Sequence, residues 1–165
     1  MFDASGTAAA QTQKINSVKL FDLSAPIITE SKLNSDNSKV TIRFSVPVYA
    51  DAKASLTLEP DDFKLTLVGG TATLKSTTPS SIDSSENGKR YQLGLDVIGI
   101  PDGREVLTIN PVDNNIYDDA ANPANKVQDN NSMNLFDKQP PTITSISLSK
   151  ACLLYTSPSP RDKRL

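Results

Sequence analysis

The chain has 165 residues, enough for one domain of about 100–150 residues with flanking segments, and its formal net charge is −2. A weakly acidic chain lacks the basic surface that nucleic acids require, and there is no apolar stretch of ~18 residues that could insert into a membrane. The sequence contains no His, and its single cysteine is Cys152, so the commonest general base and the usual zinc ligands are missing. We therefore expect no nucleic-acid partner, no membrane insertion of this segment and no enzymatic activity.

Short β-type runs separated by turn signals begin at residue 26. Residues 26–33 predict an edge-like strand, since proline is tolerated at a strand start, and residues 34–37 predict a turn. Residues 39–44 alternate apolar and polar side chains, which is the pattern of a half-buried strand. Residues 52–58 fit either a turn or a short helix. The core-facing residues of the second strand are expected to be Val40, Ile42 and Phe44.

The pattern continues to residue 136. Asp61-Asp62 marks a turn before the next strand, residues 76–89 form a polar loop or irregular edge, and residues 110–125 form a long loop rich in Asn and Asp. Further strands are predicted at residues 63–67, 71–74, 91–97, 106–109 and 127–136, with a tight turn at Pro101-Asp102-Gly103. About seven strands without an amphipathic helix predict an all-β, two-sheet sandwich.

An internal repeat organises the whole chain. The run Asn16-Ser17-Val18-Lys19-Leu20-Phe21-Asp22 recurs 115 residues later as Asn131-Ser132-Met133-Asn134-Leu135-Phe136-Asp137. The same offset, without gaps, pairs Pro26, Ile28 and Leu33 with Pro141, Ile143 and Leu148. This period exceeds a solenoid unit of about 20–45 residues and matches one sandwich of ~100 residues. We interpret residues 1–22 as the C-terminal strand of a preceding repeat, 23–137 as one complete repeat and 138–151 as the start of a following repeat.

The last residues differ in character from this pattern. Residues 152–162, with the sequence CLLYTSPSPRD, resemble an in-frame translation of a sequencing-library adaptor. We therefore treat residues 152–165 as an artefactual tail and exclude them from the expected fold.

Four segments carry a resemblance to a known family. The boundary runs at residues 22–28 and 137–143, the strand at residues 40–48 and the loop at residues 117–122 resemble bacterial Ig-like repeats of large surface and secreted proteins. The resemblance implies an Ig-like sandwich with partial flanking repeats, located outside the cell or on its surface and partnered by neighbouring repeats of the same chain. The Cys…Trp…Cys core of antibody-type domains is missing.

Five acidic residues are candidate calcium ligands, because carboxylate oxygens suit this hard cation. Two lie just before the boundary prolines, where the alternative is that they cap a strand end. Three lie in the Asx-rich loop, where the alternative is that they hydrogen-bond their own backbone. The spacing does not fit an EF-hand. The candidates are Asp22, Asp137, Asp113, Asp118 and Asp119.

Three functions fit this reading. The first is a non-catalytic spacer or stalk of an extracellular or cell-surface adhesion protein. The second is a module that binds a cell-surface glycan or protein, for which Tyr49, Tyr91 and Tyr117 are the tyrosines available in the repeat and Tyr91 is expected to be buried. The third is an accessory domain of a secreted carbohydrate-active enzyme.

Overall fold

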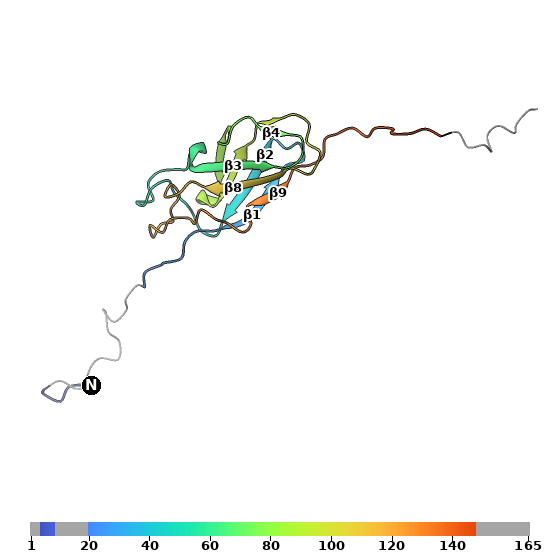
Figure 1. The fold of residues 1–165 in the computed structure, drawn as a ribbon. Coiled ribbons are helices and arrows are strands. Elements are labelled where there is room, and N and C mark those ends of the chain that lie inside the picture. Colours follow the sequence, from blue (N-terminus) through green and yellow to red (C-terminus); the bar gives the residue numbers. More distant parts are fainter. Residues whose placement is uncertain (1–3, 9–19, 148–165) are drawn as a thin grey trace, which may run out of the picture.

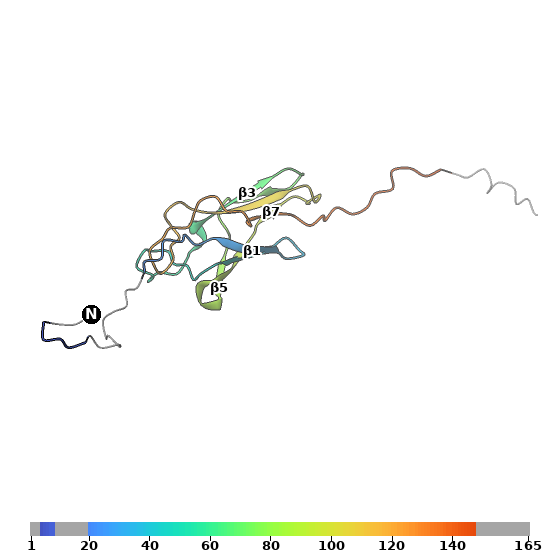
Figure 2. The same cartoon turned by 90° about the horizontal axis from the view of Figure 1, so that it is seen from below.

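The structure, a computed structural model, describes residues 4–8 and 20–147. The adaptor-like tail and most of the strand assigned to a preceding repeat lie outside these ranges. Two antiparallel sheets pack face to face and form the expected all-β sandwich, with β3 and β5 on opposite sides of the molecule (Figure 2).

The first sheet has four strands in the order β1-β2-β6-β5. Its strands are β1 (Ile28–Leu33), β2 (Lys39–Phe44), β6 (Arg90–Gly94) and β5 (Ile82–Ser85). The bounds predicted for β2 from alternation are confirmed, and its three apolar residues are fully buried. Because β2 and β6 are both internal strands, each is paired on both sides and neither offers a free edge to a partner.

The second sheet has three strands in the order β3-β8-β9, and a two-stranded ribbon of β4 and β7 lies beside it. These strands are β3 (Phe63–Val68), β8 (Val106–Pro111), β9 (Ser132–Asn134), β4 (Thr73–Leu74) and β7 (Val97–Ile98). Two single-turn 3-10 helices, η1 (Pro60–Asp62) and η2 (Glu86–Gly88), precede β3 and β6. The turn expected at Asp61-Asp62 is confirmed as η1.

Three aromatic side chains join the two sheets at the centre of the core. Phe44 and Tyr91 come from the first sheet and Phe63 from the second, with ring centroids 6.2–6.4 Å apart. Tyr91 is buried, as expected, and its hydroxyl donates a hydrogen bond to the Val48 carbonyl at 3.0 Å. Such pairs add to the free energy gained by burying the rings, so this cluster fixes the packing of one sheet on the other.

Two strand predictions were wrong by more than two residues at one end. The strand expected over residues 91–97 breaks at Leu95-Asp96, because Leu95 N–H bonds Ser38 O and Asp96 O accepts from Lys75 N–H, which moves the chain from β2 to β4. The strand expected over residues 127–136 is ordered as β9 only at its end.

The segment before β9 is held mainly by side chains, with one backbone bond from Ile109 N–H to the Asn131 carbonyl at 3.0 Å. Val127 is 81% exposed, whereas the amide groups of Gln128 and Asn131 are buried and bond Ile28 N–H and Ile109 O, each at 2.8 Å. The residues expected to form a polar loop or irregular edge, 76–89, contain β5, which is an edge strand.

The sandwich is elongated, and the chain runs through it from end to end. Residues 20–27 approach the sandwich at one end, and residues 138–147 leave it at the opposite end (Figure 1). We call these the upstream end and the downstream end. In the described part of the chain, no helix has the length and apolar character needed to cross a membrane.

Candidate functional site at the two ends of the sandwich

A buried aspartate organises the loop at the upstream end. Asp118 is almost fully buried, and its carboxylate accepts hydrogen bonds from the N–H groups of Ala120 and Asn122 at 2.9 and 2.8 Å. The Asn122 side-chain amide donates a third bond to the same carboxylate at 2.9 Å. These bonds hold the tight turn over residues 118–122, in which Ala121 has a positive φ of 68°.

Asn122 also ties this loop to the incoming chain. Its side-chain amide donates to the Asp22 carbonyl at 3.1 Å, and Asp22 Oδ1 in turn accepts from Ser24 N–H at 2.9 Å. A hollow of about 460 Å³ lies here between the incoming segment and the loop. Its lining residues are Leu20, Phe21, Asp22, Asp119 and Ala120.

A second asparagine holds the outgoing chain at the downstream end. Asn37 is buried and has a φ of 62°, a backbone conformation that asparagine tolerates better than most residues. Its side-chain oxygen accepts from Phe136 N–H at 2.9 Å, and its amide donates to Phe136 O at 2.8 Å. Two residues later, Lys138 N–H donates to Pro101 O at 2.9 Å.

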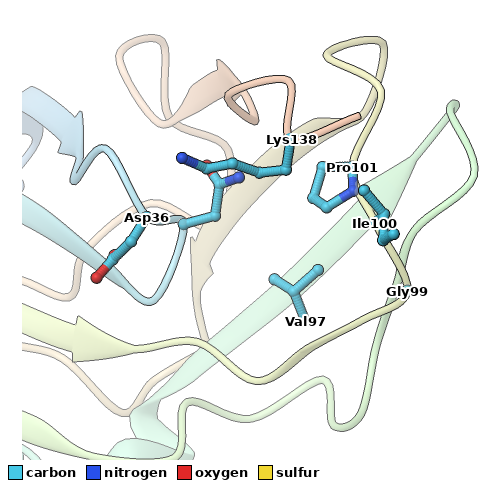
Figure 3. Close-up of a pocket in the computed structure, with 7 residues that line it drawn as sticks. Asp36, Val97, Gly99, Ile100, Pro101 and Lys138 are labelled. Atoms are coloured by element: carbon cyan, nitrogen blue, oxygen red, sulfur yellow. The ribbon is translucent and has the colours of Figure 1, made fainter. Parts of the chain in front are cut away.

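These contacts surround a hollow of about 280 Å³ at the point where the chain leaves the sandwich. Val97, Ile100 and Pro101 line it together with Asp36 and Lys138, and Figure 3 shows the Asp36 carboxylate pointing away from Val97 and Pro101. One wall of the hollow is therefore apolar, and the outgoing chain forms part of its rim.

Glu105 positions the turn that carries Pro101. It is fully buried, and its carboxylate accepts hydrogen bonds at 2.9–3.2 Å from the backbone N–H groups of Thr71, Ala72, Asp102 and Gly103. Burial by itself raises the pKa of Glu105, but the backbone donors, Ala72 first among them, more than offset it, so the pKa is lowered.

Sequence reasoning missed Glu105. The turn at Pro101-Asp102-Gly103 and the glycines Gly69-Gly70 were both visible, but no local signal indicated that one carboxylate joins them. Gly70 has a φ of 57°, and a Cβ there would clash with the Glu105 side chain, so this glycine leaves the space that the carboxylate fills.

The structure divides the five calcium candidates among three places. Asp22 and Asp119 line the upstream hollow, and Asp118 lies beneath it with its carboxylate bonded to its own loop. Asp113 lies on a separate hollow beside Lys64 and Lys126. Asp137 lies at the downstream end, where its Oδ1 accepts from Gln139 N–H at 2.8 Å.

No three acidic side chains gather into a metal-binding group within residues 4–8 and 20–147. Asp118 bonds its own loop, as the Asx-turn alternative expects, and Asp22 and Asp137 each accept a local backbone bond. Calcium binding stays a prediction. Calorimetric titration of the chain with Ca²⁺ tests it. A binding heat lost in Asp22→Asn but retained in Asp113→Asn would place calcium at the upstream end.

Two solved structures of an S-layer protein are similar to this chain. A structure of domains 1–6 of the surface layer protein SbsC matches with a TM-score of 0.46 and 23% identity, covering 72% of this chain and 14% of that one. A second SbsC structure matches with a TM-score of 0.41 and 22% identity over 70% of this chain and 14% of that one. At this level the likeness assigns no function. No protein-family model and no curated protein matches the chain.

Proposed function

We propose that this chain carries one complete unit of a tandem array of β-sandwich repeats, which acts as a non-catalytic spacer or stalk outside the cell or on its surface. The observation that carries the proposal is that the chain enters and leaves the sandwich at opposite ends, at positions one repeat period apart (Figure 1). Sandwiches joined in this way extend in a line, because each unit begins where the previous one ends.

Matching local structure at the two boundaries supports this proposal. Asp22 and Asp137 are equivalent under the 115-residue offset, and each accepts a hydrogen bond from the N–H group two residues later. The same Asx turn therefore forms before and after the complete repeat.

The burial of the preceding residues supports the same assignment. Leu135 is 3% exposed and belongs to the core, whereas its equivalent Leu20 is 86% exposed. The same Leu-Phe-Asp motif therefore follows a core strand at residues 135–137 but lies outside the core at residues 20–22. This contrast is expected if residues 20–22 belong to the preceding unit.

The alternative of a glycan- or protein-binding module has less support from the described surface. Tyr91 is buried, and Tyr49 and Tyr117 are half-buried and bridge each other through their backbones. The most exposed aromatic side chains of the described segments are Phe21 and Phe136, which occupy equivalent boundary positions. A glycan array probed with the chain tests this alternative, and specific hits would favour it.

Small-angle X-ray scattering of a two-repeat protein tests the spacer proposal. Residues 23–137 can be duplicated by joining Asp137 directly to Leu23, which reproduces the natural sequence Leu-Phe-Asp-Leu of residues 20–23. We expect the maximum dimension to be nearly twice that of the single repeat. Two folded copies that pack into a compact globule would contradict the proposal.

A further inference from the structure

The two ends of the sandwich bond different backbone groups of the boundary segments. At the downstream end, the repeat holds both backbone groups of Phe136 through Asn37 and the N–H group of Lys138 through Pro101. At the upstream end, the repeat holds the carbonyl group of Asp22 through Asn122.

The repeat register places these two sets of bonds on the same three residues. Phe136, Asp137 and Lys138 are equivalent to Phe21, Asp22 and Leu23. At a boundary inside an array, the backbone of the phenylalanine is therefore bonded to the preceding unit, and the carbonyl of the aspartate that follows is bonded to the following unit. The N–H group of the residue after the aspartate is again bonded to the preceding unit.

We infer that adjacent repeats form a rigid joint around one shared peptide group, with the second copy of this repeat as the partner of the downstream end. This inference rests on the proposed tandem array. The carbonyl of the aspartate at the boundary accepts from Asn122 of the following repeat, and the N–H group of the next residue donates to Pro101 O of the preceding repeat. In a trans peptide these groups point in opposite directions, so two repeats can hold one peptide from its two sides.

The side chains around this peptide fit the same arrangement. Leu23 is 86% exposed and occupies the position equivalent to Lys138, which lies at the rim of the downstream hollow. The hollow presents Val97, Ile100 and Pro101, an apolar wall suited to a leucine side chain (Figure 3). Burying Leu23 there removes apolar surface from water and favours the joined state.

The joint leaves no unrestrained linker between two sandwiches. Flexible linkers owe their reach to residues without fixed partners. Here the three consecutive residues at the boundary each have a backbone group bonded to one repeat or the other. Neighbouring sandwiches are therefore expected to keep one relative orientation.

The duplicated protein described above tests this inference, because it brings Pro101 of the first copy and Asn122 of the second copy to one boundary. Residues 23–137 contain no cysteine, so Thr66→Cys in each copy gives two unique labelling sites on the exposed face of β3. Electron–electron distance measurements between spin labels then report the orientation of the two copies. We expect a narrow distance distribution, and one about twice as broad when a short Gly/Ser insertion separates Asp137 from Leu23.

The decisive comparison places one substitution in either copy. Asn122→Ala in the second copy removes the bond to the boundary carbonyl and is expected to broaden the distribution. Asn122→Ala in the first copy removes the same internal bond to Asp118 but touches no boundary between copies, so the distribution should stay narrow. Asn125→Ala, in the exposed chain just after this loop, is a further control in the second copy.

The possible outcomes distinguish a failure of the rigid joint from a failure of the proposed tandem array. Two folded copies with a distribution as broad as that of the Gly/Ser variant would overturn the rigid joint and leave the array standing. Equal broadening by Asn122→Ala in both copies would also overturn the joint, since it would show a loop effect only. A second copy that fails to fold, as seen by circular dichroism, would instead contradict the proposed array.

Discussion

At the scale of single residues, the fold depends on polar side chains that satisfy backbone groups over long sequence separations. Asn37 holds Phe136, Gln128 holds Ile28, and Glu105 holds two turns together. In the described residues no buried side-chain nitrogen or oxygen is left without a hydrogen-bond partner. These residues replace strand ladders where the backbone is irregular, as buried polar groups must be paired.

Glu105 gives the sharpest prediction at this scale. Glu105→Gln replaces an anionic acceptor by an amide whose NH₂ group faces backbone donors, so we expect a loss of about 2–3 kcal/mol in unfolding free energy at pH 7. Urea denaturation measures the loss. Glu86→Gln, on the exposed outer face beside Arg43 and Arg90, is the control and should cost much less, because solvent screens its ion pairs.

The effect of Glu105 should also depend on pH. Its folded-state pKa lies below the ordinary value of 4.5, so the charged carboxylate stabilises the fold above that value. This contribution is lost as the pH falls through the folded-state pKa. The difference between the native chain and Glu105→Gln should therefore shrink in acid, and a difference that stays constant from pH 7 to pH 3 would contradict the assignment.

At the scale of elements, sequence patterns were reliable where side-chain alternation and backbone pairing coincide. The alternation of residues 39–44 gave the bounds of β2 because one face of that strand is buried and the other is not. Alternation also runs from Tyr91 to Val97, yet the chain changes partner strand at Leu95-Asp96. Burial pattern alone does not specify which strand supplies the hydrogen bonds.

The candidate site was predictable only in part for the same reason. The repeat and its boundary aspartates were visible in the sequence, as was the Asx-rich loop. The roles of Asn37 and Asn122 depend on contacts about 100 residues away, with Phe136 and Asp22. No local sequence pattern indicates such contacts, because the side chain of an asparagine in a loop usually hydrogen-bonds the backbone of its own turn.

The core prediction at this scale concerns Phe44. It is fully buried and packs against Phe63 and Tyr91, so Phe44→Ala should lower the unfolding free energy by about 3–5 kcal/mol. Val68→Ala, at the exposed end of β3, should change it by less than about 0.5 kcal/mol. Chemical denaturation of both variants checks this, and similar losses in the two would show that the sheets do not meet at Phe44.

At the scale of the whole molecule, the sandwich is complete within one repeat period. Every buried hydrophobic residue of the described chain lies between Ile28 and Leu135. The flanking segments, in contrast, expose large apolar side chains at Leu20, Phe21, Ile143 and Ile146. The stability of the fold should therefore come from residues 23–137, and the flanks should contribute through contacts with further repeats.

This division predicts the thermal behaviour of the isolated repeat. Residues 23–137 alone should unfold in one cooperative transition, with a Tm no more than about 10 °C below that of the full chain. The described bonds lost with the flanking segments are those of Asp22 with Asn122 and Ser24, of Lys138 with Pro101 and of Gln139 with Asp137, and together they contribute about 2 kcal/mol. Differential scanning calorimetry of both proteins measures the difference.

The duplicated protein should then melt above the single repeat, since the shared peptide and the burial of Leu23 stabilise both copies at once. A single repeat that fails to unfold cooperatively would contradict the assignment of residues 23–137 as one complete unit. Equal Tm values for the single and duplicated proteins would leave that unit intact and count against the joint.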